Sequence, residues 1–465
     1  MRKELFNLQF ENKQKQKSSS AKERIQKLNN IQKWILSNRI RIKTAIHSDF
    51  KKSFEETDLT EIYPVLSEIK HAKRNLKKWI NPQSVERTLT LLTHKVYIKY
   101  EAKGNVLIIS PWNYPFLLTI GPLVSAISAG NVVLIKPSEF SENTGKLIEE
   151  IITELFPKNE VAVVRGDRNI SSELLGFNFD HIFFTGSTEV GKIIAKSAAK
   201  NLTSVTLELG GKSPVIVDET ADLKSSAEKI VWGKFLNKGQ TCIAPDYVLV
   251  NKKITDQFLK NLIESIEKFY KNIDGNIQTN GDYARIISDK HHNKLTEMIE
   301  DALTNGSKIL YGGKNNLEDR FIEPTLILTN CKNCKIYEQE IFGPILPIIE
   351  YEKIEEAIDW INKLSSPLAI YIFSKNENAI NKITSFTQSG GVGINELVVQ
   401  FNHYNLPFGG VKNSGIGRSH GFAGFKTFSN ERSYIKSGSL NLLKIIFPPY
   451  TNFKKRIIDF LVRYL

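Results

Sequence analysis

Residues 106–115 read Val-Leu-Ile-Ile-Ser-Pro-Trp-Asn-Tyr-Pro, so a short apolar run passes directly into a polar segment that contains two prolines. Similar apolar runs recur over the next hundred residues, at 132–135, 161–164, 181–184 and 204–207. Segments with a helical pattern separate several of them, at 116–129, 141–155 and 190–199. Short apolar runs that alternate with helices of this length are typical of βαβ units, in which both faces of a parallel sheet are covered. The sequence therefore predicts an α/β fold.

A second alternating series begins after residue 214 and predicts a second α/β domain. Its expected helices span 253–269 and 290–303, and its expected strands span 215–218, 247–250, 308–311, 325–328, 345–350 and 368–373. We place the join between the domains close to residues 208–214. Nearer the N-terminus, residues 11–27 are polar, and apolar residues then recur at helical spacing from Ile25 to Ile35. This pattern predicts a long amphipathic helix that follows a polar, solvated N-terminal segment.

Composition excludes several classes of protein. A chain of 465 residues allows two or three domains at roughly 100–200 residues each. Three cysteines are too few for a disulfide framework, which points to a reducing compartment. No apolar stretch is long enough for a spanning helix and no secretory signal is evident, so we expect a soluble, cytoplasmic protein. The net charge of +13 is dispersed along the chain, which argues against a nucleic-acid face.

Polar or glycine-bearing segments follow three of the predicted strands, at 110–115, 136–139 and 185–191. In open α/β sheets, ligands bind beyond the carboxyl ends of the strands, so these segments are candidates for one binding site. The segment from Gly186 to Gly191 opens a predicted helix, whose free backbone N–H groups suit a phosphate. Such a turn alone is weak evidence, but a lysine and an asparagine on neighbouring strand ends strengthen it.

Two residues are candidates for covalent chemistry. Glu208 ends an apolar strand beside Gly210 and Gly211, where poor solvation would raise its pKa and suit a general base. Cys242 follows Gly239 in a polar segment. A lone cysteine is usually an inert small hydrophobe, but this polar, glycine-led setting favours a nucleophile.

Taken together and in this order, these motifs resemble the NAD(P)-dependent aldehyde dehydrogenase family, and most closely its class 3 branch of fatty and aromatic aldehyde dehydrogenases. The resemblance covers about residues 20–450. The matching segments are 111–115, 136–139, 184–187, 208–214, 239–246, 340–344, and 406–410 with 413–415. It implies two parallel-sheet α/β domains, one Rossmann-like for the cofactor and one catalytic, plus a small bridging or oligomerisation element.

The resemblance also implies domain boundaries. The cofactor domain would span 1–208, with a bridging segment at about 83–103, and the catalytic domain would span 209–392. Residues 393–465 would return to the cofactor domain, add to the bridging element and end in a tail. A homodimer is expected on the same ground.

For the chemistry, the resemblance implies that Cys242 attacks the aldehyde and that Glu208 activates the water which hydrolyses the resulting thioester. The side-chain amide of Asn113 and the backbone N–H of Cys242 would form the oxyanion hole. The product would be the carboxylic acid of a medium- or long-chain or aromatic aldehyde. Asn113 has an alternative interpretation, as the cap of a helix that begins near Pro115.

For the cofactor, the resemblance implies NAD or NADP, because a lysine at the end of the second strand tolerates a 2′-phosphate. Lys136 and Glu139 would hold the adenine ribose, and Glu340 and Phe342 the nicotinamide ribose and ring. The pyrophosphate would lie along Gly186, Ser187 and Gly191. Glu340 could instead be a surface carboxylate.

Other interpretations stay open. A CoA-acylating enzyme of the same fold generally lacks a base at the Glu208 position, and a non-catalytic scaffold is hard to reconcile with Cys242, Glu208 and Asn113 together. No metal is expected, although Cys331 and Cys334 have the spacing of half a zinc site.

Two positions depart from the class 3 pattern, Lys412 and Ser419, and we expect them to affect the substrate mouth and subunit contacts rather than the reacting groups. The C-terminal tail from about residue 440 has an amphipathic end, with Phe453, Ile457 and Phe460 on one face. It could lie on a membrane surface, but packing on the body or over a partner's substrate entrance is favoured.

Overall fold

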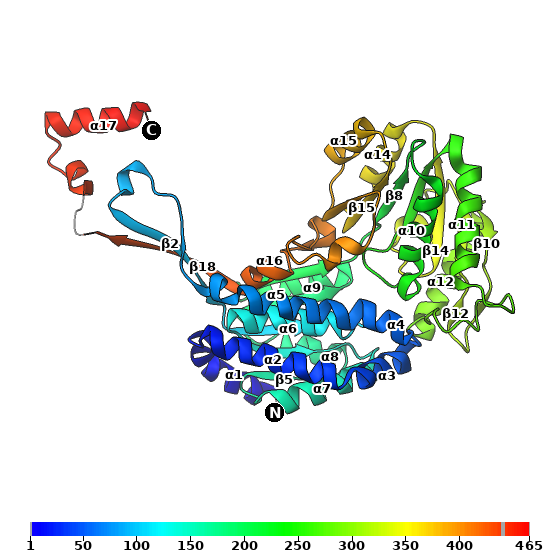
Figure 1. The fold of residues 1–465 in the computed structure, drawn as a ribbon, viewed down its shortest axis with the longest axis horizontal. Helices are drawn as coiled ribbons and strands as arrows, with labels where there is room; N and C mark the ends of the chain where they lie inside the picture. Colours follow the sequence, from blue (N-terminus) through cyan, green and yellow to red (C-terminus); the bar gives the residue numbers. More distant parts are fainter. Residues whose placement is uncertain (1, 439–441, 465) are drawn as a thin grey trace.

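The computed structural model describes residues 2–438 and 442–464, in which two large β-sheets and a smaller three-stranded one form the framework (Figure 1). The expectation of an α/β fold is confirmed by both large sheets. Residues 439–441 and Leu465 of the predicted tail lie outside the described residues. No helix in the described part of the chain is long and apolar enough to cross a membrane.

The first large sheet has the strand order β17-β7-β6-β3-β4-β5. Its five parallel strands are β3 (Asn105–Ile109), β4 (Val132–Lys136), β5 (Val161–Val163), β6 (His181–Gly186) and β7 (Ser204–Leu209). The short β17 (Gly415–Ile416) pairs antiparallel with β7, so a segment far along the chain closes this edge. The connecting helices are α6 (Leu117–Ala129), α7 (Glu142–Leu155), α8 (Arg168–Leu174) and α9 (Thr188–Ala199).

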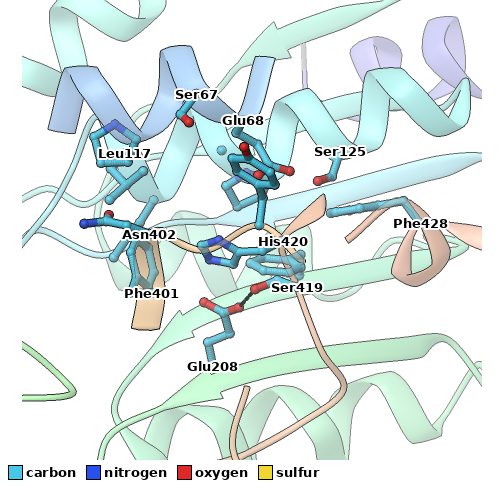
Figure 2. Close-up of a pocket in the computed structure, with 16 residues that line it drawn as sticks. Ser67, Glu68, Leu117, Ser125, Glu208, Phe401, Asn402, Ser419, His420 and Phe428 are labelled. Carbon is cyan, nitrogen blue, oxygen red and sulfur yellow. Dashed lines mark hydrogen bonds between the residues drawn. The ribbon is translucent and has the colours of Figure 1, made fainter. Parts of the chain in front are cut away.

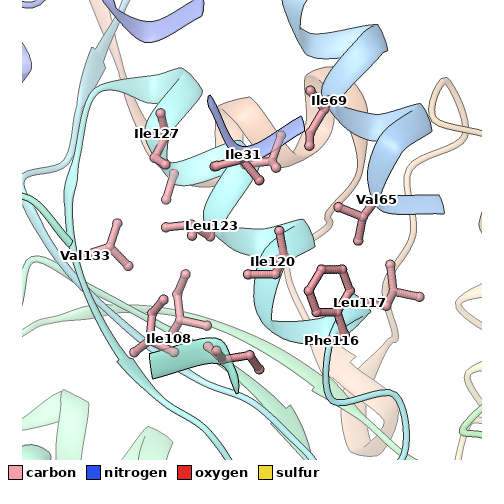
Figure 3. Packing of buried hydrophobic residues seen from close by; sticks show 14 of the residues in the cluster. Ile31, Val65, Ile69, Ile108, Phe116, Leu117, Ile120, Leu123, Ile127 and Val133 are labelled. Atoms are coloured by element: carbon pink, nitrogen blue, oxygen red, sulfur yellow. The ribbon is translucent and has the colours of Figure 1, made fainter. Parts of the chain in front are cut away.

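N-terminal helices cover one face of this sheet. They are α2 (Ala21–Ser37), α3 (Arg39–Phe50), α4 (Phe54–Thr57), the π-helical turn η1 (Asp58–Ile62) and α5 (Tyr63–Ile80). The first helix, α1 (Arg2–Lys17), instead contributes Leu5 and Phe6 to the apolar cluster on the other face. Figure 3 shows how Ile31 of α2 and Val65 and Ile69 of α5 pack on α6, above Ile108 and Val133 of the sheet. Burial of such aliphatic side chains contributes roughly 1.5–3 kcal/mol each. The apolar residues at helical spacing from Ile25 to Ile35 thus predicted α2 correctly.

The N-terminal segment differs from expectation. We expected residues 11–27 to form a polar, solvated lead, but α1 runs to Lys17 and packs beside the strands. Gln9 is fully buried, and its side-chain amide donates to the carbonyl oxygens of Val133 (3.0 Å) and Lys158 (3.2 Å). Polar side chains hold this helix, so no apolar stripe reveals it in the sequence.

The second large sheet has the order β10-β13-β14-β9-β8-β15-β16. Its strands are β8 (Pro214–Val217), β9 (Tyr247–Asn251), β10 (Lys308–Tyr311), β13 (Thr325–Leu328), β14 (Ile345–Tyr351), β15 (Ala369–Phe373) and β16 (Gly391–Ile394). All pairs are parallel except β10 with β13. The main helices are α10 (Leu223–Phe235), α11 (Thr255–Tyr270), α12 (Asp289–Thr304), α14 (Ile354–Lys363) and α15 (Glu377–Phe386). The expected strands and helices of the second series are thus present.

The three-stranded sheet forms an arm that extends from the body (Figure 1). It contains β1 (Gln83–Ser84), β2 (His94–Ala102) and β18 (Ser429–Ser437), with β2 and β18 antiparallel along their full length. Beyond it, η7 (Leu442–Ile446) and α17 (Asn452–Tyr464) lie near the far end of the arm and not on the main body. We propose the division of the chain into 1–208, 209–392 and 393–465 on the basis of these sheets.

Candidate active site

Asn113 lies in the segment between β3 and α6 and is only 3% exposed. Its side-chain Nδ2 donates to the carbonyl oxygen of Gln240 at 2.9 Å. The alternative of a helix cap is wrong, because α6 begins at Leu117 and has no side-chain cap. One amide N–H of Asn113 is therefore used to hold the segment before Cys242, and the other is left for a ligand.

The chain reaches Cys242 through a run of left-handed residues after α10. Asn237, Lys238 and Gly239 have φ values of 49°, 57° and 74°. A Cβ on Gly239 would lie 2.3 Å from the carbonyl oxygen of Gly343, so only glycine fits there. The side chain of Gln240 then donates to the Asn237 oxygen and accepts from the backbone N–H of Ile287. These contacts fix the position of the cysteine.

A buried ion pair supports the segment that contains Asn113. Lys52 and Glu61 are fully buried, and the Lys52 Nζ lies 2.9 Å from one Glu61 oxygen and 3.4 Å from the Asn113 carbonyl oxygen. The other Glu61 oxygen accepts from the backbone N–H groups of Phe116 and Leu117, both at 3.0 Å. Sequence reasoning missed this pair, since nothing in the local pattern marks two charges of one polar stretch as buried.

Replacing Lys52 by methionine is expected to lower the free energy of unfolding by about 3–5 kcal/mol, because it leaves the Glu61 carboxylate buried without its cation. Thermal or urea unfolding of the two proteins measures this. Lys51→Met is the matched control, since the neighbouring Lys51 pairs with Asp319 at the surface and should change stability little. Equal effects of the two substitutions would contradict the structural role given to Lys52.

Cys242 opens into a cavity of about 290 Å³ between the two domains. Most of its lining is apolar: Leu59, Tyr114, Leu117, Leu118, Trp232, Leu236, Ile243, Val398, Val399 and Phe401. Burial raises the pKa of the Cys242 thiol strongly, and the nearby charges of Glu340 and Glu208 raise it further. The thiol is thus neutral as it stands, and its reaction requires a base to take the proton.

Glu208 lies near the end of β7 and is 4% exposed. Its carboxylate accepts a hydrogen bond from the Ser419 hydroxyl, drawn in Figure 2, and a longer one of 3.5 Å from Thr185 Oγ1. Burial raises the pKa of Glu208 to about 7, in the direction that the sequence predicts. The expectation that Ser419 lies away from the reacting groups is wrong, because Ser419 contacts this carboxylate directly.

Glu208 lines a second cavity that adjoins the first. The two cavities share Leu117, Leu118, Phe401 and Asn402 in their linings. Glu208 is part of one lining and Cys242 of the other, yet the charge of Glu208 still acts on the thiol.

The residues expected to bind the ribose and pyrophosphate follow β4 and β6. Lys136 Nζ and a Glu139 oxygen form an ion pair of 2.7 Å, in which Lys136 is buried and Glu139 faces solvent. Ser187 caps α9 by accepting from Val190 N at 3.4 Å. A Cβ on Gly191 would lie 2.6 Å from Leu209, so this glycine lets α9 lie close to β7. The exposed N-terminus of α9 suits an anion.

Glu340 and Phe342 follow the short helix α13 (Lys335–Glu338). The Glu340 carboxylate lies against Gly210, where a Cβ would approach one of its oxygens to 2.0 Å, so the alternative of a surface carboxylate is wrong. Burial raises the pKa of Glu340 to about 8. The Phe342 ring meets that of Trp112 edge to face, with centroids 5.4 Å apart. Glu340 therefore lies near the end of β7, and Phe342 lies beside the segment that contains Asn113. Together with the residues after β4 and β6, they are compatible with a bound dinucleotide.

The half zinc site and the second departure from the family pattern lie elsewhere in the chain. Cys331 and Cys334 are free thiols, and Cys334 Sγ donates to the Cys331 carbonyl oxygen at 3.5 Å. Within residues 2–438 and 442–464, no three histidine, cysteine or acidic side chains come together as metal ligands would. Lys412, the other departure from the family pattern, is exposed and has a left-handed φ of 53°.

Two parallel sheets whose strand ends meet around a thiol and buried carboxyls are typical of a nucleotide-dependent oxidoreductase. The model of the aldehyde dehydrogenase family matches residues 10–434, and the chain belongs to this family. It is an oxidoreductase that acts on aldehydes with NAD or NADP as cofactor.

Individual relatives and a solved structure support this family assignment. The chain is 42% identical over 441 residues to 4,4'-diaponeurosporen-aldehyde dehydrogenase of Staphylococcus aureus, covering 95% of this chain and 94% of that protein. It is 40% identical to aldehyde dehydrogenase family 3 member A2 of Rattus norvegicus, with 93% and 88% covered. The solved structure of Staphylococcus aureus AldH in a substrate-bound state has a TM-score of 0.95 at 41% identity and covers 99% of both chains.

Proposed function

We propose that this enzyme oxidises medium- or long-chain aliphatic or aromatic aldehydes to carboxylic acids. The observation that carries the proposal is the apolar cavity of about 290 Å³ that ends at Cys242. Such a lining favours an extended apolar substrate over a small polar one. The relatives named for a carotenoid aldehyde and for family 3 support the same substrate class.

The residues divide the reaction between them as follows. The Cys242 thiol gives its proton to water, and the sulfur then attacks the aldehyde carbon. The negative oxygen of the thiohemiacetal accepts hydrogen bonds from the free Asn113 amide N–H and the Cys242 backbone N–H. A bound NAD or NADP would supply the acceptor for the hydride of this carbon. The carbon is then part of a thioester. Glu208 removes a proton from the water that attacks the thioester, and the acid and the Cys242 thiolate are released.

The cofactor assignments rest on the strand ends. We assign Lys136 and Glu139 to the adenine ribose, Gly186, Ser187 and Gly191 to the pyrophosphate, and Glu340 and Phe342 to the nicotinamide end. The fit is supported by the free N-terminus of α9 and by the Glu340 carboxylate held against Gly210. A buried lysine at Lys136 is compatible with a 2′-phosphate, so both cofactors are expected to bind.

We also propose a homodimer in the cytoplasm. A relative named as a dimeric NADP-preferring enzyme, from Canis lupus familiaris, is 41% identical over 92% of this chain and supports the dimer. Three free cysteines fit a reducing compartment. The sequence favoured two positions for the tail, on the body of its own subunit or over the substrate entrance of a partner subunit. Because α17 lies at the end of the arm and not on the body, we retain the second position.

A series of straight-chain aldehydes tests the substrate proposal, with NAD and NADP supplied separately and reduction followed at 340 nm. We expect kcat/KM to rise with each added methylene, up to the length that fills the cavity, by about threefold to fourfold per group. Benzaldehyde should also be oxidised. A preference for two- or three-carbon aldehydes would contradict the proposal, and release of an acyl-CoA instead of the acid would favour the CoA-acylating alternative.

A further inference from the structure

The second cavity holds a buried acid with no role so far. Glu68 of α5 is 8% exposed, and its carboxylate accepts one hydrogen bond, of 2.8 Å, from the backbone N–H of Gly421. Among the described residues, no lysine or arginine forms an ion pair with it. A buried carboxyl without a cation is costly, which is a reason to look for a function that requires it.

One short segment joins this acid to the general base. Ser419 donates its hydroxyl hydrogen to Glu208, and two residues later the Gly421 N–H donates to Glu68. In Figure 2, Ser419 and His420 lie between the two carboxyl groups. His420 and Gly421 have left-handed φ values of 71° and 48°, and a Cβ on Gly421 would lie 2.0 Å from the Tyr404 oxygen. The segment is therefore held in a single conformation.

The remaining groups around the cavity carry no competing charge. Besides the two carboxyls, its titratable lining residues are His420 and Tyr404, while α6 contributes Ser125 as its polar side chain near the cavity. Burial lowers the pKa of His420 to about 4, so its ring is neutral at physiological pH. His71 stacks on Tyr404 with ring centroids 4.1 Å apart, and burial lowers its pKa as well.

The dimensions and acidities suit proton transfer. A volume of about 40 Å³ holds roughly three or four water molecules, at roughly 10–15 Å³ for each. Burial raises the pKa of Glu68 to about 7, the same value as for Glu208. Burial thus shifts the pKa of both carboxyls in the same direction. At the mouth of the cavity, Asn402 is exposed and Tyr404 is partly exposed.

We propose that Glu68 receives the proton that Glu208 collects in each turnover, through water in the cavity beside Ser419 and His420. This inference rests on the proposed function, in which Glu208 takes a proton from the hydrolytic water. Protonated Glu208 gives that proton to a cavity water, which gives one to the Glu68 carboxylate. Glu68 then releases its proton to solvent near Asn402, and both carboxylates are ready for the next cycle.

The test uses Glu68→Gln, which keeps the size of the side chain and an oxygen acceptor for the Gly421 N–H. Above pH 8, Glu208 starts as a carboxylate, so the first acyl-enzyme formed should hydrolyse at the unaltered rate. Later turnovers should slow by about tenfold, less than the ~10²–10⁴ of a group in direct contact with the reactants. Rapid-quench mass spectrometry of the Cys242 adduct follows both phases.

Two further measurements separate a proton relay from a structural role. Added imidazole, a small diffusible base, should restore the later turnovers of Glu68→Gln, and Glu68→Asp should retain most of the rate. Ser125→Ala, which changes the same cavity without removing an acid, should behave as the unaltered enzyme. A slow first turnover, or unaltered later turnovers without any effect of imidazole, would overturn the relay. If the unaltered enzyme forms no acyl adduct at all, the proposed function fails first.

Discussion

Replacing Cys242 by alanine is expected to lower aldehyde oxidation by on the order of 10⁴-fold or more, because no other group at the floor of the apolar cavity can form the covalent adduct. Steady-state production of reduced cofactor at 340 nm measures the loss. Mass spectrometry should show an acyl adduct on the unaltered protein and none on the variant.

Cys331→Ala is the matched control for this substitution. Cys331 is also a free, half-buried thiol, but it lies after β13 rather than in the cavity. Its replacement should leave both the rate and the adduct unchanged. The assignment of the nucleophile is wrong if the Cys242 variant retains substantial activity, or if the adduct is found on Cys331.

Replacing Glu208 by glutamine should leave formation of the thioester intact and slow its hydrolysis by about 10²–10⁴-fold, the usual contribution of a general base. Acyl-enzyme then accumulates and is detected by mass. Burial raises the pKa of Glu208 to about 7, and a base works only when deprotonated, so hydrolysis should accelerate as the pH rises through about 7. The glutamine variant should lose that pH dependence.

Glu340→Gln provides the comparison, because the charge of Glu340 also acts on the Cys242 thiol, and more strongly than that of Glu208. With Glu340 assigned to the nicotinamide ribose, its replacement should raise the KM for the cofactor without accumulation of acyl-enzyme. If acyl-enzyme accumulates in the Glu340 variant and not in the Glu208 variant, the general base is Glu340.

The sequence predicts the sheets well because most strands of the two large sheets are short, largely apolar runs bounded by glycine or polar residues. The runs at 106–109 and 181–184, for example, lie within β3 and β6. The motifs at the strand ends are local as well, so Asn113, Glu208 and Cys242 could all be named before the fold was known. The parallel topology then brings Asn113 and Glu208 to one edge of the first sheet, and the hydrogen bond from Asn113 to Gln240 holds the Cys242 segment beside it.

Contacts between distant polar residues could not be predicted in this way. The Ser419–Glu208 hydrogen bond joins residues 211 positions apart, and Lys52 reaches Asn113 across 61. Burial of a charge depends on the tertiary packing of several elements, and no periodicity in the sequence records it. The helix α1 was not predicted for a related reason: buried amides such as that of Gln9 stand where an apolar stripe usually marks a helix.

The strand β17 has a consequence for biosynthesis. Its residues, Gly415–Ile416, pair with Glu208 and Leu207 at the edge of the first sheet, and Ser419 follows directly. During translation, the edge of β7 that pairs with β17 stays unpaired until about two hundred further residues, including the whole second sheet, have left the ribosome. A chain released early, before residue 415, would expose an open strand edge prone to aggregation.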